Sequence, residues 1–568
     1  MSALVLVFVG LAMLLAGYLL YGRYLSKRVY KLSEVFATPA HTERDGVDFV
    51  PTPKYVLWGH HFTSVAGAAP IVGPAVAVIW GWLPAFLWVT IGTVFFAGMH
   101  DLGALWASQR HKGRSIGSLS GRYIGPRGRN LFLVGIFFLL LMVVAAFSVV
   151  ISGLLVSTPT AVIPTWGAII IALLVGQAIY RLKWNLTAVS IVGVVALYGL
   201  MVLGDRVPVV LPESILGLSP QAFWIVTLFI YGAIASLLPV WVLLQPRDYI
   251  NGLQLFVGLG ILYLSILLVA PEVVAPSLND AAPADTPPIF PLLFVTIACG
   301  ALSGFHGIVA SGTSAKQLNR ETDARFVGYF GAVGEGLLAL GTIVATTAGF
   351  QTLAQWEEIY SAFDEGGVEA FVAGGSNLIE QGLGLPASLS ATVLATMAVL
   401  FAATTMDTGM RLQRMVVQEI GEIAGFKPSN LVATAIVVAV GLGLTFSTGA
   451  DGSGGMVIWP LFGTTNQLVA GLTMAVLCVL LLRLRRPILP VAIPMVFVMI
   501  ISVWAAIIQL GNLAAEGNWL LVVIDVVVLG AALWVIVETA ASWVRARRLP
   551  PLDWSDGALD DDQRLPLP

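Results

Sequence analysis

Short clusters of ionisable residues interrupt the long apolar segments of this sequence. His60 and His61 begin one segment, His100 and Asp101 lie within the next, and Glu335 lies near the middle of a later one. Histidine changes its charge near neutral pH, and an ionisable residue inside an apolar segment is a functional hypothesis by default. These types could pass a proton. The predicted ion-coupling residues of this kind are His60, His61, Asp101 and Glu335. A structural role is the alternative for each, and Arg110 or a histidine is the expected partner of Asp101.

A second group combines charges of both signs. Gln245, Arg247 and Asp248 follow an apolar segment, and Asp407 lies one helical turn before Arg411. Arg247 could hold a carboxylate through two hydrogen bonds. A charge pair at such a position is more often an intracellular gate or a helix stop, so we favour gating over substrate contact for Gln245, Arg247 and Asp248, and Asp407 and Arg411 are further gating candidates. For Asp407 and Arg411 a plain structural ion pair is the leading interpretation.

The composition identifies the solvent in which these residues work. Hydrophobic residues make up 58% of the 568 residues and charged residues only 11%, whereas soluble domains average about 25% charged. The mean hydropathy is +0.89. Such a chain belongs in a bilayer, which excludes a nucleic-acid binder, a secreted disulfide scaffold and a soluble enzyme. Cys299 and Cys478 lie in apolar runs, where they pack as small hydrophobic residues. A metal site at His60 and His61 has little support, because the sequence offers no third ligand nearby.

The sequence predicts an all-α integral membrane protein with about fifteen membrane-spanning helices. The predicted spans are 2–22, 60–80, 84–108, 131–157, 164–180, 186–204, 221–244, 251–271, 291–312, 326–350, 386–408, 431–448, 457–482, 488–510 and 519–543. If the loop 23–59 is cytoplasmic, 28 of the 29 Lys and Arg residues fall inside and only Arg206 falls outside. The positive-inside rule therefore places the amino terminus outside and the carboxyl terminus inside.

Two proline-containing sites predict broken helices in an internal repeat. The first comprises Ala66, Gly67, Ala68 and Pro70, and the second is Ala235–Pro239, with Ser236 and Pro239. The range 60–204 holds five predicted spans and the range 221–408 holds five more. Because five is an odd number, the second set starts from the opposite side of the membrane, which predicts a 5+5 inverted-repeat (LeuT-like) core. Bared backbone groups there would bind substrate; plain proline kinks are the alternative. The predicted regions are 1–58 (anchor helix and cytoplasmic loop), 59–210 (first repeat), 211–430 (second repeat), 431–545 (accessory helices) and 546–568 (disordered acidic tail).

Several long motifs resemble the carbon starvation protein CstA family from about residue 2 to 545. They are FVPTPKYVLWGHHFTSVAGAAPIVGP, MHDLGALWASQRHKGRSIG, LLPVWVLLQPRDYIN, SGFHGIVASGTSAKQL, TTMDTGMRLQR and LFGTTNQLVA. The resemblance implies an inner-membrane protein of the amino acid–polyamine–organocation superfamily, which takes up peptides, or pyruvate with protons. In that superfamily the first broken helix and the helix at 291–312 flank a cation site. Ser311 and Thr313 are then expected to serve Na⁺, or His306 a proton. Small-residue helix packing is the alternative.

The leading prediction is secondary active transport by alternating access. The cargo would be a small carboxylate such as pyruvate, or a short peptide, and a proton or sodium gradient would drive it inward across the inner membrane. The predicted substrate-binding residues are Ala66, Gly67, Ala68, Pro70, Ser236, Pro239, Ser303 and His306. The alternatives are a channel and, with less support, a membrane-embedded enzyme, since no Walker or HExxH motif occurs and the predicted cytoplasmic loops are too short for a catalytic domain. We expect lipid contact and no cofactor beyond the coupling ion, no metal, no nucleic acid and no ATPase subunit.

Overall fold

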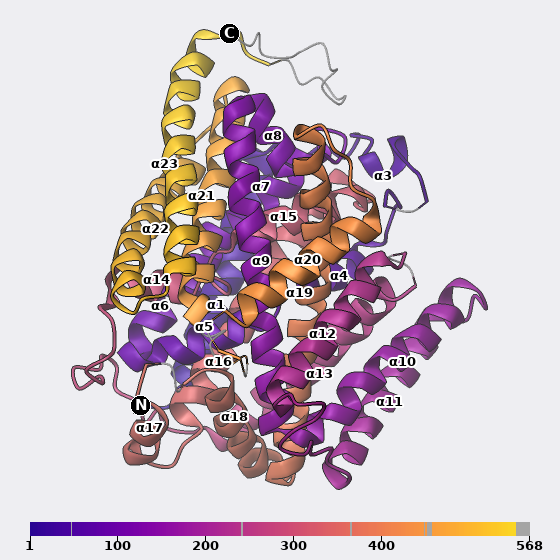
Figure 1. Ribbon diagram of the computed structural model, residues 1–568, viewed down its shortest axis with the longest axis vertical. Helices are drawn as coiled ribbons and strands as arrows, with labels where there is room; N and C mark the ends of the chain where they lie inside the picture. The colour runs from indigo at the N-terminus through magenta and orange to yellow at the C-terminus, as the bar shows by residue number, and fades with distance from the viewer. Residues whose placement is uncertain are drawn as a thin grey trace.

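The computed structural model describes residues 1–46, 48–239, 242–363, 366–447, 449–450, 452 and 457–552. These residues fold into helices only, with three isolated β-bridges and no strand, and the two ends of the chain lie at opposite ends of the bundle (Figure 1). The predicted all-α fold is therefore confirmed for the described chain. Of the predicted tail 546–568, the first three residues belong to the last helix, and residues 553–568 lie outside the described part.

The helices differ widely in length, from three residues in α2 to 37 in α19. The first half contains α1 (Ala3–Ala16), α2 (Gly22–Tyr24), α3 (Pro39–Thr42), α4 (Lys54–Ala66), α5 (Ala69–Ala77), α6 (Trp82–Gly92), α7 (Gly98–Gln109), α8 (Ile116–Tyr123), α9 (Pro126–Ser157), α10 (Val162–Tyr180), α11 (Leu186–Arg206), α12 (Pro220–Leu237) and α13 (Leu244–Val269). The second half contains α14 (Ile289–Thr296), α15 (Gly304–Gly312), α16 (Phe330–Ala348), α17 (Leu353–Ile359), α18 (Val368–Leu383), α19 (Ala387–Ile423), α20 (Asn430–Thr445), α21 (Ile458–Arg483), α22 (Leu489–Ala515) and α23 (Trp519–Arg548). Short π-helical turns extend α1 and join α6 to α7.

Twelve helices of the described chain are long and apolar enough to cross a membrane. The bent pair formed by α4 and α5 raises the number to 13 if it counts as one span. The other two of the fifteen predicted spans correspond to α20, which has only 16 residues, and to the separate helices α14 and α15. The protein is thus a multi-pass membrane protein, while the number fifteen and the orientation remain predictions.

The bundle exposes apolar side chains outward and keeps polar ones inside. Outward-facing residues include Ile170 and Leu174 on α10, Val192 on α11 and Val537 on α23, each more than 60% exposed. The interior holds nearly all the histidines together with buried Asp, Glu and Arg side chains. This is the reverse of a water-soluble protein, and it matches a hydrocarbon surround.

The first predicted break is confirmed. Helix α4 ends at Ala66 and α5 begins at Ala69, and the two axes differ by 47°. Gly67 between them has φ +56 and ψ −158, a conformation that favours glycine, and a Cβ at this position would lie 2.7 Å from the Phe147 ring. Pro70 stands in the first turn of α5, where its missing N–H costs no hydrogen bond.

The second predicted break is wrong. Residues Ala235–Pro239 do not interrupt a span: α12 runs unbroken to Leu237, and Pro239 lies in the connection to α13. The second interruption instead separates α14 from α15, where residues 297–303 leave the helix and Gly300 has φ +90. A proline after a helix end is a common stop signal, which explains why Pro239 imitates a break.

The two interruptions touch each other in the middle of the bundle. An ideal Cβ on Gly73 of α5 would lie 2.5 Å from the Thr296 carbonyl oxygen, and one on Gly300 would lie 3.5 Å from Pro70 Cα. Around them the long helices α9 and α19 pack side by side, while α9 also packs against α20 and α19 against α12. The α10–α11 pair lies at the edge of the bundle (Figure 1).

We predict that Gly73→Ala loosens this central contact. The added methyl group meets backbone atoms of residues 296 and 297, which cannot turn away, so overpacking should cost about 1–3 kcal/mol. Thermal unfolding of the purified protein in detergent measures the effect. Gly199→Ala on α11 is the control, because no atom lies within 4 Å of its ideal Cβ. Equal melting temperatures of the two variants would contradict the close approach.

Candidate functional site

Side chains from other helices satisfy the backbone groups that the second break exposes. The Gly300 carbonyl accepts from Thr93 Oγ1 at 2.9 Å, and its N–H donates to Glu335 Oε2 at 3.4 Å. The Phe305 N–H at the start of α15 donates to Asn466 Oδ1 at 2.9 Å. Lipid offers no partner for such groups, so the break persists only because these side chains surround it. At the first break, Thr405 Oγ1 donates to the Ser64 carbonyl at 3.3 Å.

A buried chain of carboxylates and histidines lies beside the second break. Asp101 Oδ1 is 2.8 Å from His100 Nδ1, and Asp101 Oδ2 is 2.7 Å from His306 Nδ1. The other ring nitrogen of His306, Nε2, lies 3.0 Å from Glu335 Oε2. All four side chains are at most 1% exposed. Both nitrogens of His306 therefore face carboxylates, and at least one proton must be shared among the three groups to avoid two uncompensated buried charges.

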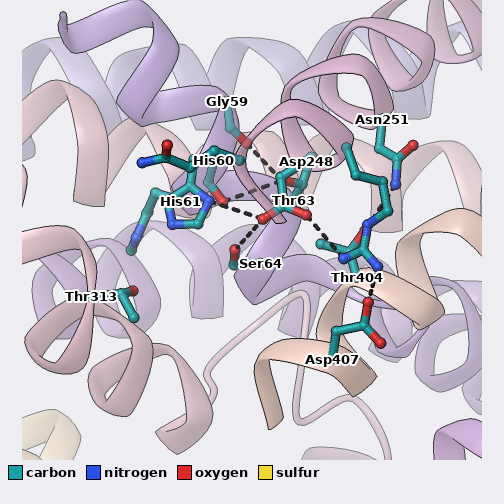
Figure 2. A network of polar contacts seen from close by, with 12 residues as sticks. Gly59, His60, His61, Thr63, Ser64, Asp248, Asn251, Thr313, Thr404 and Asp407 are labelled. Atoms are coloured by element: carbon teal, nitrogen blue, oxygen red, sulfur yellow. Dashed lines mark hydrogen bonds and ion pairs between the residues drawn. The ribbon is translucent and has the colours of Figure 1, made fainter. Parts of the chain in front are cut away.

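A second buried network joins four helices around Arg247, and Figure 2 labels three of its members, Asp248, Asp407 and His60. The Arg247 guanidinium contacts Asp407 of α19, Asp248 beside it at 3.1 Å, and the Tyr231 hydroxyl of α12 at 2.6 Å. Tyr231 in turn donates to Asp407 at 2.8 Å. Asp248 also lies 2.9 Å from His60 Nδ1 of α4. A buried ion pair of this kind holds helices in one arrangement, and losing one partner strands a charge.

The adjacent histidines of α4 belong to different surroundings. His60 contacts Asp248 (Figure 2), whereas His61 Nδ1 lies 2.8 Å from Ser314 Oγ, just after α15. His60 also lines a small cavity of about 30 Å³, together with Gln245, Thr313 and Arg411. The Lys- and Arg-rich segments 110–129, 483–486 and 545–548 lie together at one end of the bundle, which we call the basic end, and Lys316 lines this cavity as well. His60 thus connects the Arg247 network to this cavity.

The structure assigns several predicted residues other partners than expected. Asp407 and Arg411 do not pair: Asp407 contacts Arg247, and Arg411 donates to the Leu238 carbonyl at the end of α12. The helical spacing was right, but a nearer cation from α13 takes the carboxylate. For Asp101 the expected histidine partner is confirmed, twice over, by His100 and His306, whereas Arg110, the other expected partner, pairs with Glu321.

The hydroxyl and helix-end candidates lie apart from these networks. Ser311 Oγ donates to Gly307 O and accepts from Ile116 N–H, and Thr313 Oγ1 donates to Val309 O. Ser236 Oγ bonds Ala233 O within α12, and Ser303 Oγ bonds Asn466. Among the described residues, no group of three or more His, Cys, Asp or Glu side chains is suited to hold a metal ion.

Sequence reasoning missed three polar contributors. Tyr231 completes the Arg247 network, and Asn251 Nδ2, one turn after Arg247, donates to Thr404 Oγ1 at 2.9 Å. The four-residue spacing from Arg247 to Asn251 was a usable signal, because it puts both on one face of α13. Nothing in the sequence indicated a polar role for Tyr231, since an aromatic residue in an apolar helix usually makes only apolar packing contacts.

His111 is a structural histidine outside the candidate spans. Its Nδ1–H donates to Ala107 O at 2.6 Å, and its Nε2 accepts from the Tyr123 hydroxyl at 2.6 Å. Burial lowers the pKa of His111 to about 3, the bond to Ala107 opposes the shift, and the nearby Arg122 and Arg114 lower it further. His111 is thus neutral at physiological pH.

Comparisons with known proteins cover most of the chain. A family model described as "Carbon starvation protein CstA" matches residues 2–355 and 346–505. The peptide transporter CstA of Campylobacter jejuni is 33% identical over 89% of this chain and 80% of that protein. The pyruvate/proton symporter BtsT of Escherichia coli is 30% identical over 89% of this chain and 81% of that protein. A crystal structure of the Eremococcus coleocola manganese transporter covers 89% of this chain and 99% of its own, at 11% identity and a TM-score of 0.48.

We predict that Asp407→Asn destabilises the fold strongly. Removing the carboxylate leaves Arg247 with an incomplete set of partners in a buried site, which should cost about 3–5 kcal/mol. The apolar double variant Arg247→Met/Asp407→Leu should recover much of that loss, because it removes both charges. Thermal unfolding compares these variants with Asp280→Asn, a control at an exposed residue. A double variant as unstable as the sum of its single variants would contradict the direct coupling.

A second prediction concerns pH. Because the unfolded chain protonates His111 near pH 6.5 and the folded chain only near pH 3, the unfolded state binds more protons between these values. Stability should therefore fall as the pH drops from 6.5 toward 3. His111→Gln should flatten this fall by about 1 kcal/mol per pH unit, measured as the difference in melting temperature between pH 7 and 5. The exposed His41→Gln serves as control, and identical slopes in both variants would contradict a neutral His111.

Proposed function

The chain belongs to the carbon starvation protein CstA family, and from this premise we propose that it is a secondary active transporter. It imports a small carboxylate such as pyruvate, or a short peptide, and couples the uptake to a proton gradient by alternating access. The proposal follows the functions for which the relatives are named, peptide transport and pyruvate/proton symport. Both kinds of cargo carry a carboxylate, and the inner membrane is the proposed location.

One observation carries the proton-coupling proposal. His306 lies between two carboxylates, Asp101 and Glu335, at 2.7 and 3.0 Å, in a fully buried position beside the contact of the two helix breaks. A proton entering or leaving this triad changes the charge of groups that hold the Gly300 backbone in place. The protonation state can thus bias which arrangement of the break is stable, and this is what coupling requires.

The proposed coupling ion is H⁺ rather than Na⁺. Sodium prefers a cage of oxygen ligands, whereas the triad offers an imidazole between two carboxylates. The Ser311 hydroxyl donates to a carbonyl of its own helix, as does that of Thr313. These hydroxyls support the sodium alternative less well than the triad supports a proton.

We propose an inverted repeat whose two units have different boundaries from the ranges 59–210 and 211–430 that the sequence predicts. The first unit would contain α4/α5, α6/α7, α9, α12 and α13, with the α10–α11 pair as an insertion, and the second α14/α15, α16, α19, α20 and α21. Three facts support this assignment: each unit begins with a broken helix, the breaks touch, and the packing of α9 on α20 mirrors that of α19 on α12. Because the insertion consists of two spans, an even number, it does not change the side on which the second unit begins, and that unit remains inverted. The substrate would bind where the breaks meet, near Gly67, Pro70 and Ser303.

The Arg247 network is the proposed gate toward the basic end. It ties α4, α12, α13 and α19 together, and beyond it lies the small cavity lined by His60, Gln245 and Arg411. Separating Asp407 from Arg247 would release α19 from α13 and widen this cavity. A buried ion pair suits a gate because its desolvation penalty largely offsets its Coulomb energy. The closed state therefore need not be much lower in free energy than the open state.

Uptake into proteoliposomes tests the function. Labelled pyruvate and a labelled dipeptide are supplied outside, with a proton or a sodium gradient imposed separately. We predict saturable accumulation above the outside concentration with the proton gradient only. Glu335→Gln and His306→Ala should lower this accumulation at least tenfold but retain most of the counterflow exchange, because exchange needs no net proton movement.

Matched controls keep the result interpretable. Glu213→Gln and His41→Ala make the same chemical changes at exposed positions and should accumulate substrate normally. Normal accumulation in both triad variants would remove the triad from coupling. Flux without saturation or accumulation would favour a channel, and conversion of the substrate to a product would favour an enzyme.

A further inference from the structure

A large cavity at the basic end of the molecule lies apart from the proposed transport site. It has a volume of about 670 Å³ and lies between the α8–α9 joint and the last turns of α23, with one residue of α21 in its wall. Both α8 and the end of α23 reach the end of the bundle where the chain terminates (Figure 1). The predicted transport residues are absent from its lining.

The lining of this cavity is strongly cationic. Four arginines contribute to it against one carboxylate, Glu538; they are Arg122, Arg127, Arg545 and Arg548. Arg545 donates to Ser542 Oγ at 3.0 Å and thereby holds its guanidinium along the wall. One guanidinium nitrogen of Arg122, NH2, is buried and makes no hydrogen bond within the described chain. Among the described residues that line the cavity, the single carboxylate of Glu538 does not balance the charge of the four arginines.

The start of α9 adds a further attraction for an anion. This 32-residue helix begins at Pro126 after Gly125, which has φ +134, and no side chain among the described residues caps it. Pro126 has no N–H and the Gly125 N–H donates to the Ser120 carbonyl, so the donors without a partner in the helix are the N–H groups of Arg127 and Gly128. The helix dipole makes this end partly positive. Gly125, Pro126 and Arg127 all line the cavity.

The cavity also lies at the level where the apolar surface ends. The apolar run of α9 starts at Leu131, two residues after Arg129, and the last apolar residue of α23 before its basic last turn is Val544. Arginines one turn beyond an apolar span lie among lipid headgroups, and Trp543 is an aromatic anchor of the kind found there. Ile124, Val479 and Leu549 give the cavity an apolar wall as well.

We propose that this cavity binds the headgroup of an anionic phospholipid. The phosphate would accept paired hydrogen bonds from the arginines and the N–H groups at the start of α9, and the apolar wall would contact the glycerol and the first acyl carbons. A lipid fits better than a free anion because the site is both cationic and apolar at headgroup depth. The competing occupant is the acidic segment 553–568 of the same chain.

Native mass spectrometry of the full chain tests the proposal. The protein in detergent is titrated with phosphatidylglycerol, with zwitterionic phosphatidylcholine, and with inorganic phosphate. We expect phosphatidylglycerol to bind most tightly. Arg548→Gln should weaken it about fivefold and Arg127→Gln/Arg548→Gln about twenty-fivefold, since each basic residue near the surface contributes about a factor of five.

Arg547→Gln is the matched control, because Arg547 precedes Arg548 but does not line the cavity. It should leave the affinity within about twofold, and the melting temperatures of all variants without lipid should agree. Equal loss in Arg547→Gln and Arg548→Gln would overturn the site, as would equal binding of phosphatidylcholine. Displacement of the lipid by millimolar inorganic phosphate would overturn the lipid as the occupant. A chain ending at Leu552 that binds lipid while the full chain does not would assign the cavity to the acidic tail instead.

Discussion

The fold depends on the need to satisfy peptide groups where two membrane helices are interrupted. In hydrocarbon each unpaired N–H or C=O costs several kcal/mol, so an interruption survives only inside a shell of polar side chains. In this protein that shell comes from four separate elements: Thr93, Glu335 and Asn466 serve the second break, and Thr405 serves the first. Because one of these partners is a carboxylate, the shell itself is ionisable. The requirement that stabilises the break therefore also places an ionisable group against its backbone.

How far the sequence could lead differs between the two breaks. The first was predictable because Gly67 and Pro70 combine a left-handed position with a residue that starts a helix, and both signals are local. The second contains no proline, and its Gly300 is one of 59 glycines, so nothing local distinguishes it. The proline at 239 was the stronger signal and was misleading. A helix end and a helix break look alike until the following segment is placed in space.

Contacts across the chain set a similar limit for the site. The individual ionisable residues were predictable, since a charge inside an apolar run is rare and costly. Their partners were not. Asp101 and His306 are 205 residues apart, and Arg247 and Asp407 are 160 apart, so helix packing alone brings them together. Arg411 lies one helical turn from Asp407, the spacing at which an ion pair is expected. In the structure Asp407 nevertheless contacts Arg247 of another helix, and Arg411 donates to the Leu238 carbonyl.

Under the proposed function, α4 is the element that links coupling to gating. Neighbouring residues on a helix point about 100° apart, so His60 and His61 address different partners from one rigid segment. His60 contacts Asp248 in the gate network, and His61 contacts Ser314 just after α15, the helix that carries His306. The ideal Cβ of Gly331 on α16 lies 3.0 Å from the His61 ring, one turn before Glu335 on the same helix. Under this proposal, a rotation of α4 about the break at Gly67 would alter both sets of contacts together, so that protonation of the triad and opening of the Arg247 network would be linked through one short helix.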